Sequence, residues 1–231
     1  MSFKLEPKYL LRSLLIFVSI LLVFHIGVNY VRFNYYIDNG IWSTNDYVKV
    51  LINLFDFNTE NNIPTFYSAL ALLLSSVLLR LIALTYKKQN LTFYSWILLS
   101  VVFLFLSLDE MLELHEHLVR LTQRLLNLSG FGTAYWTIPY VTAVIILFLL
   151  LIKFLNKLPK RTLKLFVLAG ILFILGSVGM EIIGGRQEEI FGRENITYVL
   201  FYTIEELLEM IGVIIFIYAL TSIKTFSVKI D

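Results

Sequence analysis

Apolar residues occur in long blocks along the chain, and most blocks have the length of a membrane-spanning helix. Six blocks stand out, at residues 9–30, 65–85, 92–116, 135–155, 163–183 and 197–221. About 20 apolar residues in an α-helix cross the roughly 30 Å hydrocarbon layer of a bilayer. The pattern therefore predicts an all-α polytopic membrane bundle of six transmembrane helices, with residues 1–231 forming a single membrane domain.

The one long connection between these blocks, residues 31–64, carries a different pattern. Polar residues recur there at helical spacing, namely Asp46, Lys49, Asn53 and Asp56. Apolar residues fill the opposite face, which predicts a short amphipathic helix at about 46–56. Such a helix either lies in the membrane interface or packs on the bundle as an ordinary loop helix.

Prolines and glycines mark helix starts and helix contacts. Pro64 and Pro139 fall in the first turns of the second and fourth blocks, where proline is tolerated. Small residues let membrane helices approach closely, which predicts tight packing around the fifth block. The glycines concerned are Gly170, Gly176, Gly179 and Gly184.

Composition excludes a soluble domain. The 231 residues are 58% hydrophobic and 16% charged, with a mean hydropathy of +0.78, whereas soluble domains carry about 25% charged residues. The net charge of +2 gives no reason to expect nucleic acid as a partner. Because the chain has no cysteine, disulfides and thiolate metal sites are excluded.

Lys and Arg are unevenly distributed between the two sides of the predicted bundle. With the N-terminus inside, twelve of the 19 lie in cytoplasmic segments and six in outer ones. Because cytoplasmic loops carry the excess of positive charge, both termini are predicted to be cytoplasmic and the protein to lie in the cell (inner) membrane. The lipid bilayer is the expected partner, and a homo-oligomer or a membrane partner stays open.

Acidic residues are concentrated within, or at the ends of, three predicted spans. They are Asp109, Glu110, Glu113, Glu116, Glu181, Glu205, Glu206 and Glu209. Ionisable side chains inside a membrane are costly and indicate a functional site by default. Alternating span directions place these groups in the outer half of the bilayer. His25 reaches a similar depth, although a lone histidine there is more typical of a hydrogen-bonded core residue.

Helical geometry brings many of these groups onto shared faces. On a straight helix, Asp109, Glu110, Glu113, Glu116 and His117 share one third of the surface. Glu205 and Glu209 form a stripe on the last span with Tyr198 and Tyr202, and Glu206 lies to its side. Glu110 and Glu206, off the main stripes, fit arginine pairing equally well. Carboxylate and imidazole groups on facing helices are ligands for divalent metals. The predicted cofactor is a divalent metal ion held by Asp109, Glu113, Glu116, His117, Glu181, Glu205 and Glu209.

Three functions fit this cluster. The first is a metal-dependent membrane enzyme acting on a lipid or a group at the outer surface, with Glu113, Glu116 or Glu209 as catalytic general base. The second is a cation or proton channel or transporter. The third is a structural or partner-binding subunit, in which outer arginines such as Arg186 pair with the acids. The apolar inner halves of the spans favour a site open on one side, and therefore the first function.

Three short segments resemble a set of bacterial multi-pass membrane proteins of unknown function. They are Asn62–Thr65, Ser107–Glu110 with the following His115–Glu116, and Tyr202–Gly212. The resemblance extends over most of the chain and implies a multi-pass bundle in a bacterial inner membrane. It implies no activity, cofactor or catalytic residue.

Overall fold

The computed structural model of the protein describes residues 6–37, 46–114, 117 and 137–223, and its regular elements are all helices. The long ones are α1 (Pro7–Val31), α3 (Ile63–Lys88), α4 (Tyr94–Leu112), α6 (Thr137–Leu155), α7 (Lys160–Ile174) and α9 (Ile196–Thr221). A π-helical segment, Leu175–Met180, joins α7 to α8 (Glu181–Phe191) in one rod, and another, Arg32–Ile37, extends α1. The prediction of an all-α bundle is confirmed.

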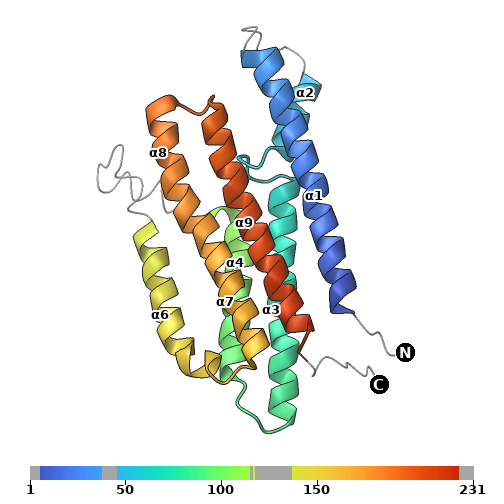
Figure 1. Cartoon of the computed structure of the whole chain (residues 1–231), viewed down its shortest axis with the longest axis vertical. Coiled ribbons are helices and arrows are strands. Elements are labelled where there is room, and N and C mark those ends of the chain that lie inside the picture. Colours follow the sequence, from blue (N-terminus) through green and yellow to red (C-terminus); the bar gives the residue numbers. More distant parts are fainter. Residues whose placement is uncertain (1–5, 38–45, 115–116, 118–136, 224–231) are drawn as a thin grey trace.

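The long helices alternate in direction, so that α1 begins and α9 ends at the same end of the bundle (Figure 1). We call the end that holds Pro7 and Thr221 the lower end and the opposite one the upper end. α9 lies in the middle of the bundle and packs against α1, α3 and the α7–α8 rod. α6 runs along the outside (Figure 1).

Four helices are long and apolar enough to cross a membrane, so the prediction of six spans is wrong. They cover Pro7–Asn34, Ile63–Lys88, Tyr94–Leu112 and Lys160–Phe191. In α6 the apolar stretch Pro139–Leu155 is shorter than a span. In α9 every stretch of 18 residues contains Glu205, Glu206 and Glu209, so this helix is too acidic to face lipid as an apolar span.

The outward faces of α1 and α6 carry large apolar side chains. Exposed residues on α1 include Ile16, Phe17, Ile20, Val23 and Phe24, and those on α6 include Ile145, Ile146, Phe148, Leu149 and Leu150. Apolar surface of this extent is not left in contact with water by a monomeric soluble protein. It is the surface that a helix presents to lipid.

The short helix predicted at about 46–56 is present as α2 (Asp46–Phe55) and contacts α1 and α3. The next helix, α3, begins after Asn62, whose Oδ1 accepts a hydrogen bond from the backbone N–H of Thr65 at 2.9 Å. This side chain satisfies one of the free N–H groups of the first turn. Pro64 and Pro139 lie in the first turns of α3 and α6, as predicted.

Apolar side chains fill the lower half of the bundle interior. The larger buried cluster includes Leu79, Ile82, Trp96, Leu151, Phe166, Ile217 and Leu220, from α3, α4, α6, α7 and α9. A smaller one, which extends from the middle of the bundle toward the upper end, includes Val18, Leu21, Phe57, Met210 and Ile214. The buried polar side chains described in the middle and lower half are hydroxyls, those of Ser75, Ser76, Ser100 and Thr221.

Two of these serines hold α3 and α4 together. Ser76 Oγ donates to the carbonyl oxygen of Ser100 at 2.7 Å, and Ser100 Oγ donates to that of Ser76 at 3.0 Å. Closer to the upper end, Ser107 Oγ donates to the carbonyl oxygen of Ala69 at 2.8 Å. Small side chains with interhelical hydrogen bonds are a major source of helix association in membranes, because apolar contacts gain little over lipid.

Two glycines let the α7–α8 rod approach α9 closely. A Cβ atom added at Gly212 would lie 2.9 Å from the carbonyl oxygen of Ala169, and one at Gly176 would lie 2.8 Å from that of Glu205. Both positions leave no room for a side chain, so the helices meet backbone to backbone. Gly176 confirms the predicted tight packing, whereas Gly170 has open space around it.

We expect Gly212→Ala to lower the free energy of unfolding by about 1–3 kcal/mol, the usual cost of overpacking an interior. Gly170→Ala is the matched control, because its new methyl group meets nothing within 4 Å. Thermal unfolding of the purified protein in detergent measures both. Equal midpoints for the two variants would contradict the close contact of α7 and α9.

Candidate functional site

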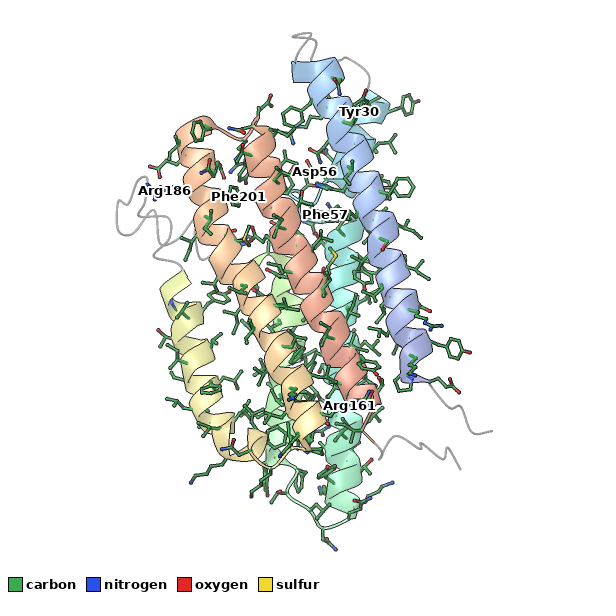
Figure 2. The ribbon with its side chains drawn as sticks, viewed as in Figure 1. Tyr30, Asp56, Phe57, Arg161, Arg186 and Phe201 are labelled. Atoms are coloured by element: carbon green, nitrogen blue, oxygen red, sulfur yellow. The ribbon has the colours of Figure 1, made fainter. Side chains whose placement is uncertain are left out.

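A buried polar network joins the α2–α3 connection to α1 near the upper end. The side chains of Asp56 and His25 are each 1% exposed, and Figure 2 shows Asp56 between α1 and α9. Asp56 Oδ2 accepts a hydrogen bond from Arg32 Nη1 at 3.1 Å, and Oδ1 lies 3.5 Å from His25 Nδ1. Arg32 therefore compensates a buried negative charge that would be strongly destabilising alone.

His25 resembles the middle member of an Asp–His–hydroxyl triad, because its Nε2 lies 2.8 Å from Thr203 Oγ1. The hydrogen bond at its other ring nitrogen argues against that role. The backbone N–H of Phe57 donates to His25 Nδ1 at 3.1 Å, so Nδ1 is unprotonated and Nε2 carries the hydrogen. Nε2 then donates to Thr203 and cannot accept its proton as a general base. We infer that His25 is a hydrogen-bonded structural residue.

Tyrosine and asparagine side chains extend the network to α9. The Tyr202 hydroxyl donates to Asn29 Oδ1 at 3.2 Å, and the Tyr198 hydroxyl donates to Asn58 Oδ1 at 2.8 Å. Asn29 Nδ2 donates in turn to Asp56 Oδ1 at 3.4 Å. Three segments distant in sequence are therefore joined at one level, and buried polar groups find partners that lipid cannot supply.

A hollow of about 340 Å³ lies beside this network at the upper end. Its lining includes Asp56 and three basic side chains, those of Arg32, Lys49 and Arg193. Two of these also form ion pairs, Arg193 with Glu188 and Arg32 with Glu194. The basic groups of the lining are therefore largely neutralised by acids of the same end, and the hollow has no strong preference for an ion of either sign.

Carboxyl groups from three helices gather in the upper half of the bundle. Glu205 of α9 is in hydrogen-bonding contact with Glu181 of α8, and Glu206 and Glu209 are its next acidic neighbours. Glu206 in turn lies beside Glu110 of α4. We call these five residues the carboxyl cluster. Its members come from segments that are distant in sequence, so it is a product of the fold.

The π-helical segment Leu175–Met180 immediately precedes Glu181. A π-helical turn contains more residues than an α-helical one and therefore changes which face of the helix the following residues occupy. Gly176, within this segment, packs against Glu209, where an added Cβ would lie 2.7 Å from its Cγ. Such insertions are frequent at functional sites.

The acidic stripe predicted for the third span is interrupted in the structure. α4 ends at Leu112, before the predicted boundary of 116, and Glu113 has a left-handed backbone conformation with φ of 52°. The Glu113 carboxylate accepts a hydrogen bond from the side-chain amide of Asn61. Spacing along a straight helix therefore does not give the positions of the residues that follow Leu112.

The other predicted ligands in or just after α4 do not lie together. Asp109 is buried and accepts a hydrogen bond from the Tyr140 hydroxyl of α6 at 3.2 Å. His117 is exposed, and its Nδ1 lies 2.7 Å from the carbonyl oxygen of Glu113. Glu116 lies outside the described residues. The structure therefore brings together Glu181, Glu205 and Glu209 of the predicted ligand set.

Within the described ranges, no three His, Asp or Glu side chains are arranged to hold one metal ion. Asp109, Glu113 and His117 accordingly each have a different hydrogen-bond partner, as described above. Metal binding by the seven predicted residues stays a prediction.

Spacing along straight helices did not predict the full membership of the carboxyl cluster or the buried network around Asp56. Glu110 and Glu206 lie off the predicted stripes, yet they are neighbours in the structure, and Glu60 lies near Glu206 as well. Nothing in the sequence signalled Asp56 as a buried acid. One available signal was the spacing of His25, Asn29 and Arg32, which places three polar residues on one face of an otherwise apolar helix.

Four candidate spans and an apolar outer surface define a multi-pass α-helical membrane protein. The chain belongs to the DUF8692 family, described as a domain of unknown function, whose model matches residues 14–223. No curated protein and no solved structure matches the chain. The family agrees with the resemblance to membrane proteins of unknown function and supplies no activity.

We expect Asp56→Ala to destabilise the protein by about 3–5 kcal/mol, because it leaves Arg32 beside a buried site without its carboxylate. Glu188→Ala, which removes an exposed ion pair with Arg193 at the same end, should cost about 1 kcal/mol or less. Thermal unfolding in detergent compares the two. If Asp56→Ala lowers the thermal stability no more than the control does, the structural role of the network is contradicted.

Proposed function

We propose that the protein is a multi-pass membrane protein whose carboxyl cluster binds a cation, and that it acts in catalysis or sensing at its upper face. A divalent metal ion is the expected cation. Glu181, Glu205 and Glu209 would contribute ligands, and Asp109, Glu113, Glu116 and His117 complete the predicted set. With such an ion as Lewis acid, Glu113, Glu116 and Glu209 are the candidates for a general base.

The contact between Glu181 and Glu205 carries this proposal. Two carboxylates this close repel each other strongly in a medium of low dielectric constant, so both cannot remain ionised without a cation between them. Glu206, Glu209 and Glu110 add to this repulsion.

The same contact favours a proton as the second candidate cation. Two carboxyl groups in hydrogen-bonding contact can share one proton without any further ligand, and they then titrate as a pair. This alternative requires no rearrangement of Asp109 or Glu113. It would make the packing of α8 against α9 dependent on pH.

The lower half of the bundle supports a site that opens on one side. A conduit needs polar groups or water along its whole length. Below the carboxyl cluster, the described interior is the apolar cluster around Leu79, Trp96 and Ile217, with serine hydroxyls bonded between α3 and α4. This filling favours binding or catalysis over transport through a single chain.

Elemental analysis of the full chain purified in detergent tests the metal. We expect a divalent metal in stoichiometric amount, and a loss of most of it in the double variant Glu205→Gln, Glu209→Gln, which keeps the shape of both side chains and removes their charge. Glu189→Gln, on the exposed face of α8, and His115→Ala are the controls and should retain the metal.

Two other results would separate the alternatives. Metal-free protein whose thermal stability varies with pH, with the variation removed by Glu205→Gln, would identify a proton as the cation. Metal-free protein whose stability responds to pH in the same way with and without Glu205→Gln would contradict a cation site altogether.

We also propose that the lower end lies in the cytoplasm. Nine described Lys and Arg lie at this end, namely Lys8, Arg12, Lys87, Lys88, Lys153, Lys157, Lys160, Arg161 and Lys164. Those described at the upper end are Arg32, Lys49, Arg186 and Arg193. The side richer in Lys and Arg is the cytoplasmic one as a rule.

Reporter fusions test this orientation. A fluorescent protein that folds only in the cytoplasm should be active when fused after residue 158, between α6 and α7, because that link lies at the lower end. The same fusion after residue 193, between α8 and α9, should be inactive. The opposite pair of results would reverse the orientation.

A further inference from the structure

A second hollow, of about 430 Å³, lies at the lower end between the start of α7 and the end of α9. Its lining consists of Lys160, Arg161, Lys164, Leu165 and Tyr218. Arg161 Nη2 donates to the Tyr218 hydroxyl at 3.0 Å, which joins the two helices at the hollow. Figure 2 shows Arg161 at the lower end of α7, beside α9.

The charges around this hollow are almost all positive. Among the described residues of the lower end, Glu6 is the only acid, against the nine Lys and Arg named above. Three of those nine line the hollow from two adjacent turns of one helix. Summed like charges on a concave surface concentrate the field and attract anions.

The place of these three cations in α7 is itself unfavourable. Lys160, Arg161 and Lys164 lie at the N-terminus of the helix, where the helix dipole is positive and disfavours cations. The first turn contains no acidic residue, and Pro159 provides no side-chain cap. An anion in the hollow would remove this repulsion.

Apolar surface continues from the hollow along α7. Val167, Leu168 and Ile171 are between 44% and 51% exposed, within a helix that is long and apolar enough to span the membrane. The hollow therefore lies where the hydrocarbon layer meets the headgroups. A ligand with an anionic head and an acyl tail matches both parts of this surface, whereas a free anion matches only the hollow.

We propose that this hollow binds the phosphate group of an anionic membrane lipid. Arg161 supplies the planar pair of N–H donors that matches phosphate oxygens, and Lys160 and Lys164 add charge. The Tyr218 hydroxyl accepts from Arg161 and keeps its own hydrogen to donate. Basic pockets between membrane helices bind anionic lipid headgroups in this way. The site is separate from the carboxyl cluster.

Thermal unfolding of the full chain in neutral detergent tests the site. Phosphatidylglycerol should raise the unfolding midpoint, while phosphatidylcholine with the same acyl chains should not. In Arg161→Gln, the phosphatidylglycerol concentration for half the shift should rise about tenfold, the effect of losing one charged hydrogen bond. Tyr218→Phe, which keeps every charge, should weaken binding in the same direction.

The matched control is the double variant Lys87→Gln, Lys88→Gln. It removes two charges from the same end, at the end of α3, outside the hollow. Its lipid response should stay within about twofold of the unchanged protein, because distant surface charges are screened. The proposed site would be contradicted if this double variant lost as much of its response to phosphatidylglycerol as Arg161→Gln does. Equal shifts of the unfolding midpoint with both lipids would contradict it as well.

Inorganic phosphate at matched concentrations distinguishes the source of the phosphate. A shift with phosphatidylglycerol and none with phosphate supports a lipid ligand. An equal shift with phosphate alone would overturn the lipid assignment and identify a site for the free anion. Far-UV circular dichroism of each variant confirms that the helices are retained, and Tyr218→Phe provides the test if Arg161→Gln does not fold.

Discussion

The glutamates of α9 are the constraint on which the arrangement of the bundle depends. Glu205, Glu206 and Glu209 interrupt an otherwise apolar helix, and exposing them to lipid would cost several kcal/mol. α9 therefore takes the middle of the bundle, with α1, α3 and the α7–α8 rod around it. Close approach of the rod requires glycine at 176 and 212, because a side chain at either position would meet α9 or α7 backbone.

Two kinds of buried acid occur near the upper end, and their surroundings differ. Asp56 has a guanidinium 3.1 Å away and further donors from Asn29 and the backbone of Asn58, so its charge is compensated within the protein. Glu205 lies instead among carboxyl groups, those of Glu181, Glu206 and Glu209. The first arrangement holds a fixed structure together, whereas in the second the carboxyl groups repel one another as long as they are ionised.

The bundle is divided along its length. Its upper half contains the buried network, the carboxyl cluster and a hollow, and its lower half contains the larger apolar cluster. Below the carboxyl cluster lie the packed side chains of Trp96, Phe166 and Ile217. At the lower end polarity returns only at the surface, around Arg161 and Tyr218.

The membrane class, the helix positions and the start of α3 at Pro64 follow from the sequence alone, because block length, composition and first-turn residues are local properties. The number of spans did not follow from block length, because α9 is long enough to be a span but too acidic to face lipid. Tertiary structure alone decided that Glu110 meets Glu206 and that Glu113 turns out of α4. It also decided the hydrogen-bond partners of His25, one of which, Thr203, lies 178 residues away. Such contacts depend on how distant segments pack, and helical spacing within one segment cannot determine them.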